Sequence, residues 1–239
     1  MKNGMEGKLM SENDGTIHIF LAGDSTVANC PVHEYPMSGW GQVLPQFFNN
    51  KVKIINEAKG GASSNTFIEE GRLNKILEKI KVDDYLFIQF GHNDQKSYGT
   101  DARTTYKDCL LQFINGANEK GTHPVLITSV QRRSFNNEGK IVNTLGEYPE
   151  TMRSLAREKD IPLIDLWQKS KTLYESFGVE KSKRLFMWAK PNELTNYPNG
   201  IEDNTHFSEF GATEIAKLVI EGIKELQIPL INYIIHTES

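Results

Sequence analysis

The sequence of 239 residues predicts an α/β fold with three layers, in which helices cover both faces of a mostly parallel, five-stranded sheet. Two observations support this prediction. Five short apolar runs are rich in β-branched residues, as is typical of strands buried on both faces. Between them lie segments in which apolar residues recur every three or four positions, as on one face of a helix. Strands that alternate with helices form right-handed crossovers, which produce a doubly wound parallel sheet.

The predicted strands, in chain order, are residues 16–22, 52–58, 84–90, 124–130 and 161–165. The predicted helices include residues 73–80, 106–118, 151–159 and 208–226. The strands rest on runs such as TIHIFLA and DYLFIQF, and the helices rest on apolar residues spaced three or four apart. In such folds ligands bind beyond the carboxyl ends of the strands. The residues that follow each strand are therefore the first candidates for a functional site.

Two stretches are predicted as long loops, and loops of this length in a compact domain often shape a binding site. Residues 131–144 are polar, and residues 187–204 contain prolines and a glycine among aromatic residues. The apolar residues 228–235 fit either an edge strand or a packed extension. We find no internal repeat or linker, so we expect a flexible segment at residues 1–15 followed by a single domain at residues 16–239.

The sequence Gly23-Asp24-Ser25-Thr26 follows the first predicted strand. On its own, Gly-Asp-Ser is also common in turns and helix caps. Directly after a buried strand, however, such a turn lifts the Ser25 hydroxyl to the edge of the sheet and leaves its backbone amide free. Ser25 is therefore a candidate nucleophile, with its own amide as one oxyanion donor. We expect Asp24 to have a structural role, in which it accepts hydrogen bonds from backbone amides within the turn.

Candidate oxyanion donors follow the next two predicted strands. Gly61 ends the sequence NEAKGG, and a glycine amide can approach a carbonyl without a side chain in the way, although the two glycines also fit a simple sharp turn. Asn93 lies in the sequence GHND, and its side-chain amide donates a hydrogen bond without adding charge. Its neighbours His92 and Asp94 are expected to brace the loop.

The sequence Asp203-Asn204-Thr205-His206 supplies a carboxylate and an imidazole three positions apart. Asp203 would bind one ring nitrogen of His206 and leave the other to take the proton from Ser25. In a mild environment the pKa of this histidine would lie near ~6.5, and activity would rise as it loses its proton. The alternative is that Asp203 or Ser208 caps the following helix and that His206 lies unused on the surface.

Together, these four motifs resemble those of the SGNH (GDSL-like) hydrolase superfamily over most of the chain. The stretches GDSTVA, GWG and EGR, at residues 23–28, 39–41 and 70–72, are most similar to its rhamnogalacturonan acetylesterase branch. The resemblance implies a flavodoxin-like fold and the removal of acetyl groups from pectic oligosaccharides through an acyl-enzyme, or alternatively from another acetylated sugar such as xylan fragments. The implied catalytic residues are the nucleophile Ser25, the oxyanion donors Gly61 and Asn93, and the base pair Asp203 and His206. Thr26 replaces the leucine of the superfamily's name, which is usual in this branch.

Substrate specificity is expected to come from the loops. The candidates for stacking on sugar rings are Trp40, Trp188 and Tyr197, and the candidates for binding hydroxyl groups are Asn192 and Asn199. Aromatic residues of this kind also serve as core or loop anchors. Arg72 is a candidate for binding a uronate carboxylate, with a surface ion pair as its alternative role.

The composition limits the partners. The net charge of −4 leaves no basic surface of the kind that binds phosphate backbones, so we do not expect nucleic acid as a partner. Cys30 and Cys109 are too few for a disulfide framework and are expected to be free thiols. No segment is typical of a signal peptide or a membrane span. We therefore expect a soluble cytoplasmic protein that acts on acetylated oligosaccharides without a metal or organic cofactor; the sequence does not determine its oligomeric state.

Two other functions fit parts of the pattern. A metal-dependent phosphoesterase could assemble a ligand shell from Asp24, Asn93, Asp94, Asp203 and His206. The spacing is poor for this, because no Asp-x-His pair follows the first strand and no second histidine-rich motif is present. A catalytically silent carbohydrate-binding protein on the same fold would lack a catalytic residue, and none is missing here. Loss of activity on chelation, restored by a divalent metal, would favour the first of these alternatives.

Overall fold

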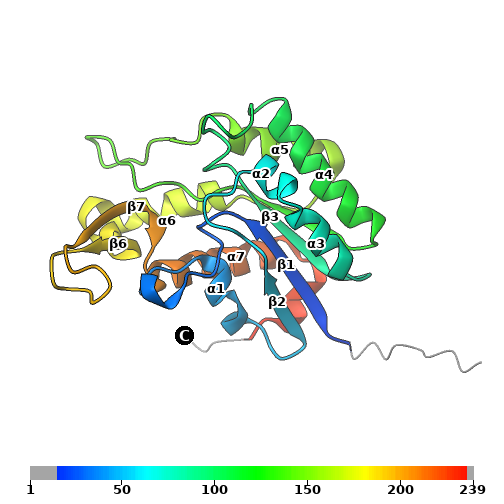
Figure 1. Ribbon diagram of the computed structural model, residues 1–239, viewed down its shortest axis with the longest axis horizontal. Coiled ribbons are helices and arrows are strands. Elements are labelled where there is room, and N and C mark those ends of the chain that lie inside the picture. Colours follow the sequence, from blue (N-terminus) through cyan, green and yellow to red (C-terminus); the bar gives the residue numbers. More distant parts are fainter. Residues whose placement is uncertain (1–14, 236–239) are drawn as a thin grey trace, which may run out of the picture.

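The computed structural model describes residues 15–235 (Figure 1). Its centre is a five-stranded sheet in the order β2-β1-β3-β4-β5, and all neighbouring strands are parallel. The strands are β1 (Ile17–Gly23), β2 (Val52–Asn56), β3 (Tyr85–Gln89), β4 (His123–Ile127) and β5 (Leu163–Ile164). The predicted doubly wound fold is confirmed. Its strand order reverses between β1 and β3, where ligands bind in folds of this kind. Of the predicted flexible segment at residues 1–15, only residue 15 lies within the described residues.

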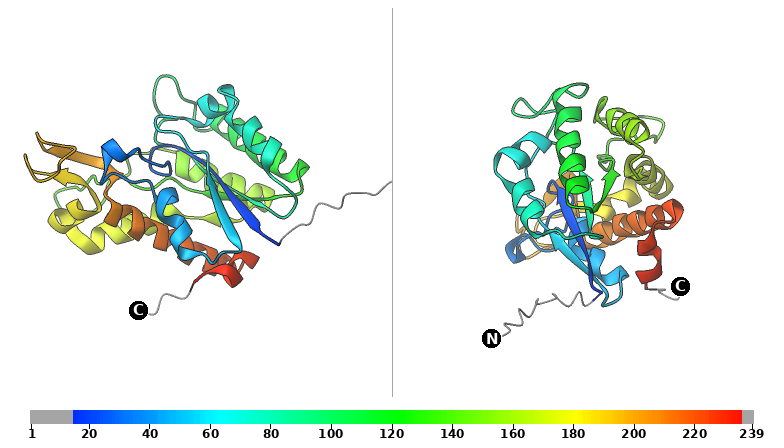
Figure 2. Two further views of the ribbon diagram at one scale, coloured as in Figure 1. Left: turned by 60° about the horizontal axis from the view of Figure 1, so that its bottom comes forward. Right: turned by 90° about the vertical axis from the view of Figure 1, so that its right-hand side faces the viewer.

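Helices cover both faces of the sheet (Figure 2). On one face lie α1 (Trp40–Val43), α6 (Leu166–Lys181) and α7 (Glu209–Leu226). On the other lie α2 (Ser64–Glu69), α3 (Arg72–Lys79), α4 (Thr105–Glu119) and α5 (Tyr148–Lys159). Short 3-10 helices span Val32–Glu34, Leu44–Phe47, Ser182–Leu185 and Pro229–Tyr233. The helices α3, α4, α5 and α7 were predicted, whereas α1, α2 and α6 were not.

The side chains of β1 divide the core into two layers. Ile19 and Leu21 pack on the side of α7, whereas Phe20 and Ala22 pack on the side of α3 and α4. Successive residues of a strand point to opposite faces, so a strand covered on both faces is apolar at every position. This is the pattern from which the strand was predicted.

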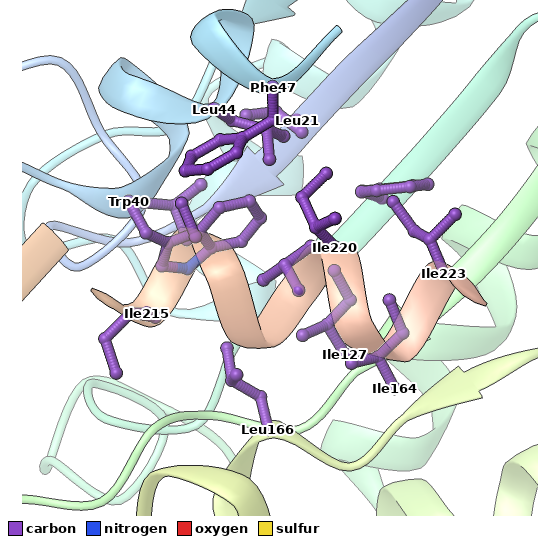
Figure 3. Packing of buried hydrophobic residues seen from close by; sticks show 14 of the residues in the cluster. Leu21, Trp40, Leu44, Phe47, Ile127, Ile164, Leu166, Ile215, Ile220 and Ile223 are labelled. Atoms are coloured by element: carbon purple, nitrogen blue, oxygen red, sulfur yellow. The ribbon is translucent and has the colours of Figure 1, made fainter. Parts of the chain in front are cut away.

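Trp40 lies inside the core, so the prediction that it stacks on a sugar ring is wrong. Its side chain has 0% exposure and lies among apolar residues beside α7 (Figure 3). Its indole N–H donates a hydrogen bond to Oε1 of Gln89 at 2.8 Å. A Cβ on either flanking glycine, Gly39 or Gly41, would lie within 2.5 Å of a backbone oxygen of the chain just after Ser25. The GWG sequence therefore packs directly against the turn that carries the serine.

A separate antiparallel hairpin, formed by β6 (Phe186–Ala189) and β7 (Ile201–Phe207), lies beyond the carboxyl ends of the sheet strands (Figure 1). We predicted residues 187–204 as a long loop, and this prediction is wrong for the strand residues. Only Phe207 of β7 is buried. Because β7 lies outside the sheet, it lacks the apolar run that marked the other strands.

Two other segments were predicted as irregular or left open. Residues 131–144 contain no helix or strand and only one isolated bridge, in agreement with the loop prediction. Residues 228–235 form a packed extension: Leu230 is buried within the last 3-10 helix, and Ile234 makes a single bridge to Phe48. The edge-strand alternative is therefore wrong.

Two expectations from the composition can be compared with the fold. Within residues 15–235, no helix combines the length and the apolar character needed to cross a membrane. Cys30 and Cys109 are both free thiols, as predicted, and Cys109 is buried.

Candidate active site

Ser25, His206 and Asp203 come together beyond the carboxyl end of β1, although 181 residues separate the serine from the histidine. Oγ of Ser25 lies 2.9 Å from Nε2 of His206. Nδ1 of His206 lies 2.6 Å from Oδ2 of Asp203. With its proton on Nδ1, the imidazole donates to the carboxylate and accepts from the serine hydroxyl. In this arrangement an imidazole can remove the proton of a serine.

A chain of buried hydrogen bonds holds the turn that carries Ser25. Asp24 is fully buried, and its Oδ1 accepts from the backbone N–H of Thr26 at 2.9 Å and from its hydroxyl at 2.8 Å. Nε2 of Gln89 donates to the same hydroxyl at 2.7 Å, and Trp40 donates to the other end of Gln89. A leucine at position 26 could make neither side-chain bond. Asp24 therefore braces the turn, as expected, and Thr26 ties it to the core.

Gly61 and Asn93 line the same cavity as Ser25. Asn93 is buried, and its side-chain amide donates to the carbonyl of Ala62 at 3.0 Å, which fixes the amide and leaves one hydrogen free. Gly61 has φ +77°, a conformation that favours glycine. Among the described residues, the backbone N–H groups of Ser25 and Gly61 have no acceptor. Donors that could stabilise a negatively charged oxygen therefore line the cavity that contains the serine.

His92 and Asp94 hold the loop on which Asn93 lies. Nε2 of His92 donates to the carbonyl of Val130 at 2.8 Å, and burial lowers the pKa of this imidazole, which favours its neutral form. Oδ1 of Asp94 accepts from the backbone N–H of Ser64 at 2.9 Å and from its hydroxyl at 2.5 Å. Burial raises the pKa of this carboxyl. Both side chains brace the loop, as expected.

A bulge in β7 brings Asp203 and His206 to the same side. In a regular strand, side chains three positions apart point to opposite faces. Here the pairing register shifts between Phe186 and Trp188, which leaves four residues of β7 (203 to 206) opposite one residue of β6. Oδ1 of Asp203 accepts from the backbone N–H groups of Thr205 and His206 at 2.7 and 2.9 Å. The carboxylate thus stabilises the bulge and binds the imidazole at the same time.

Asn204 connects the bulge to a cluster on the hairpin. Its Oδ1 accepts from Nη1 of Arg133 at 3.0 Å and from Nε1 of Trp188 at 3.1 Å. Its carbonyl accepts from the backbone N–H of Arg133 at 2.8 Å. The Arg133 guanidinium lies 5.2 Å and the Lys183 ammonium 4.7 Å from the Trp188 ring centre. The ring that we expected to stack on a sugar therefore packs against two cations and supports the strand that carries His206.

The capping alternative is correct for Ser208 only. Its hydroxyl accepts from the backbone N–H of Gly211 at 3.1 Å and caps the N-terminus of α7. This cap does not leave His206 unused, because the imidazole lies before the helix and faces Ser25.

The pair of Asp203 and His206 is electrostatically matched. The hydrogen bond to Asp203 raises the pKa of His206 above its ordinary value and outweighs the opposite effect of burial. Burial alone would raise the pKa of Asp203, but hydrogen bonds from the ring and backbone of His206 lower it. The carboxylate therefore favours the imidazolium that forms when the histidine takes a proton. The pKa of His206 is therefore higher than the expected value of ~6.5.

The cavity around Ser25 has a volume of about 820 Å³. Of the predicted substrate-binding residues, only Tyr197 lines it, and its hydroxyl donates to the carbonyl of Glu34 at 2.9 Å. Lys96 and Arg132 also line it. Neither was predicted: Arg132 is a single cation in a loop without a motif, and Lys96 lies just outside the GHND sequence.

The other predicted substrate-binding residues lie outside this cavity. Trp188 and Asn199 line a second cavity of about 730 Å³ beside the hairpin. Asn192 is exposed in the loop that joins β6 to β7. Nε of Arg72 donates to Oε2 of Glu70 at 3.1 Å. Arg72 thus forms the surface ion pair given as its alternative role and does not line the Ser25 cavity; uronate binding by Arg72 stays a prediction.

The residues proposed for a metal-dependent enzyme do not form one ligand shell. Among residues 15–235, no three His, Cys, Asp or Glu side chains are grouped so as to hold a metal ion. Asp24 binds Thr26 within its turn, Asp94 binds Ser64, and Asp203 binds His206. The three carboxylates proposed as metal ligands thus belong to three separate hydrogen-bond networks.

Comparison with known proteins agrees with the sequence resemblance. The family model for GDSL-like lipases and acylhydrolases matches residues 19–219. The chain is 60% identical over 223 residues to rhamnogalacturonan acetylesterase RhgT of Bacillus subtilis (strain 168), covering 93% of this chain and 96% of that protein. It is 45% identical over 222 residues to the probable rhamnogalacturonan acetylesterase YesY of the same organism, covering 91% and 97%. The crystal structure of Bacillus subtilis protein YxiM matches with a TM-score of 0.78 at 28% identity, covering 90% of this chain and 58% of that longer chain.

Proposed function

This chain belongs to the GDSL-like lipase/acylhydrolase family, and from that membership we propose that it is a serine esterase that removes acetyl groups from carbohydrate, with rhamnogalacturonan oligosaccharides as substrate. The observation that carries the chemistry is the alignment of Ser25, His206 and Asp203, with contacts of 2.9 and 2.6 Å between side chains from distant parts of the chain. The identity to RhgT supports the substrate class. We further propose that residues 16–239 form a single catalytic domain.

The first half of the reaction forms an acyl-enzyme. Nε2 of His206 takes the proton of the Ser25 hydroxyl while Oγ attacks the acetyl carbonyl. Asp203 holds the ring and stabilises the imidazolium, in agreement with the raised pKa of His206. The imidazolium then gives its proton to the oxygen of the departing sugar, so the sugar leaves as a neutral alcohol.

The tetrahedral intermediate carries a negative oxygen that needs donors. We assign this role to the backbone N–H groups of Ser25 and Gly61 and to the side-chain amide of Asn93. Removal of one such donor costs about 10² to 10³ in turnover in comparable sites. In the second half of the reaction Nε2 of His206 takes a proton from a water molecule, whose oxygen attacks the carbonyl of the acetyl-serine. The imidazolium then gives the proton to Oγ of Ser25 as the ester bond breaks, which regenerates the serine and releases acetic acid, which ionises to acetate.

The test is acetate release by the wild type and by Ser25→Ala from three substrates: acetylated rhamnogalacturonan oligosaccharides, acetylated xylan fragments and an aryl acetate. We expect the wild type to release acetate fastest from the first, and Ser25→Ala to release none above background. Faster release from xylan fragments would indicate that the alternative sugar is the substrate. Release from the aryl ester alone would leave an esterase but overturn the carbohydrate assignment.

A further inference from the structure

Two cations of the Ser25 cavity have no carboxylate partner among the described residues. Lys96 and Arg132 both line the cavity, and no Asp or Glu in residues 15–235 forms an ion pair with either. Lys96 is exposed and lies beside the ring of Tyr98, with its ammonium 5.7 Å from the ring centre. Positive charge without a protein counter-ion is therefore concentrated where a substrate would bind.

Arg132 is held in place by neutral oxygens only. Its Nη1 donates to the carbonyl and hydroxyl of Thr144 at 3.3 and 3.2 Å, and its Nη2 donates to the carbonyl of His92 at 3.3 Å. With its amide turned, Gln95 adds another neutral oxygen at 2.9 Å. The buried carboxylate of Asp24 acts on the guanidinium through space, without a direct contact. The side chain is thus positioned, but its charge is not paired.

The charges of the cavity are arranged by the strand order. Lys96 follows β3 and Arg132 follows β4, and these strands are neighbours in the sheet. The acidic residue Glu34 of the cavity lies in the 3-10 helix Val32–Glu34 that follows β1, and its backbone carbonyl accepts from the hydroxyl of Tyr197. The remaining carboxylate, Asp203, is bound to its histidine. The two cations therefore follow neighbouring strands, β3 and β4, whereas Glu34 follows β1.

We propose that Arg132 and Lys96 form a subsite for a carboxylate of the substrate, beside the acetyl ester that Ser25 attacks. Among the described residues the Nε–H of Arg132 has no acceptor, so the guanidinium can offer this donor together with its unpaired charge, and the flexible lysine adds charge. The class of ligand that fits is a sugar chain with free uronate carboxylates. The proposal rests on the proposed function for the identity of the substrate, whereas its test requires only that the protein hydrolyses an aryl acetate.

The test measures inhibition of aryl acetate hydrolysis by an unacetylated uronate trisaccharide and by its methyl ester. The two inhibitors have the same sugar rings and differ in their charge. In the wild type we expect the acid to have an inhibition constant about 10- to 100-fold below that of the ester, the range of one or two hydrogen bonds to a charged group. Arg132→Gln should bring the ratio of the two constants close to one, and Lys96→Gln should reduce it.

Two further variants make the result specific. Arg132→Lys keeps the charge and should retain part of the preference. Lys120→Gln removes an exposed cation that does not line the cavity, and it should keep the wild-type ratio. Because Lys96 is exposed, Lys96→Gln gives a result even if Arg132→Gln does not fold.

Equal inhibition by acid and ester in the wild type, or no inhibition by either, would overturn the proposal. So would a ratio in both glutamine variants equal to that of Lys120→Gln. Failure of the proposed function has a different signature. In that case acetylated rhamnogalacturonan releases no acetate, while aryl acetate hydrolysis and the ratio of inhibition constants remain measurable.

Discussion

The two sides of the candidate active site are built differently. Ser25 follows a strand in the interior of the sheet, and its turn is tied to the core through Thr26 and Gln89. His206 lies on a two-stranded hairpin outside the sheet, on a strand with one buried residue. We call these the sheet side and the hairpin side.

Different interactions fix the catalytic groups on the two sides. On the sheet side, the fold places the nucleophile, because apolar packing on both faces fixes the end of β1. On the hairpin side, the base depends on a bulge held by polar contacts of Asp203 and Asn204. Loss of a polar contact should therefore mainly affect stability on the sheet side and mainly affect catalysis on the hairpin side.

Removal of either catalytic group tests whether the two sides act as one unit. Ser25→Ala and His206→Ala should each lower kcat by about 10⁴- to 10⁶-fold, because neither group can activate the reaction without the other. The double variant should be no worse than either single one. Acetate release and aryl acetate hydrolysis measure the loss, with circular dichroism to show that each variant is folded. A double variant far below both single variants would mean that the two sides contribute independently.

The pH profile isolates the hairpin side. His206 must be neutral to act as a base, and its hydrogen bond to Asp203 raises its pKa. Values of kcat/KM should therefore rise with pH through a midpoint above ~6.5 and fall about tenfold for each unit below it. Asp203→Asn should shift the midpoint downward and lower kcat. A profile that is flat between about pH 5 and 8 would argue against His206 as the base.

Asn204 supports the strand that carries His206, so its loss tests the hairpin side without removing a catalytic group. Asn204→Ala removes an acceptor of Arg133 and Trp188, and we expect kcat to fall by up to about 10²-fold through misplacement of His206, with KM little changed. Asn204→Asp keeps an acceptor oxygen and should recover part of the loss. The control is Glu202→Gln, at an exposed position of the same strand without a side-chain hydrogen bond or ion pair among the described residues.

Steady-state kinetics and the pH profile of Asn204→Ala decide between positioning and a general loss of structure. A shifted pH midpoint together with a lower kcat supports positioning of the imidazole. Equal losses in Asn204→Ala and Glu202→Gln, with an unchanged midpoint, would contradict it.

The contrast also explains which features could be predicted from the sequence. The strands of the sheet are largely apolar because they are covered on both faces, so the fold could be predicted from their apolar runs. The positions of Ser25, Gly61 and Asn93 followed, because each comes after a parallel strand and such strand ends share one edge. The hairpin could not be predicted, since β7 buries only Phe207 and carries polar residues where a strand pattern is expected.

Substrate-contacting residues were the least predictable. Residue type alone does not distinguish an aromatic ring in the core from one in a cavity, and Trp40 proved to be in the core. Arg132 has no local signal either, because its place in the cavity depends on contacts with Thr144 at the far end of its own loop and with His92 from the loop after β3. These positions depend on tertiary packing of long loops, which leaves no periodic pattern in the chain.

Loss of the Thr26 hydroxyl, on the sheet side, should reduce activity least among these variants. Thr26→Val keeps the shape of the side chain but removes the hydroxyl, so Asp24 loses a donor and Gln89 loses an acceptor in a buried network. The free energy of unfolding should fall by about 1 to 3 kcal/mol, which lowers Tm by roughly 2–4 °C for each kcal/mol in a chain of this size. Because packing still fixes the turn, kcat should fall less than in Asn204→Ala.

The control is Thr172→Val, at an exposed position of α6, which should change stability by no more than about 0.5 kcal/mol. Thermal unfolding and steady-state kinetics on the same samples compare the two sides directly. A large loss of kcat in Thr26→Val without a change in Tm would show that the sheet side also depends on polar positioning, and the contrast between the two sides would fail.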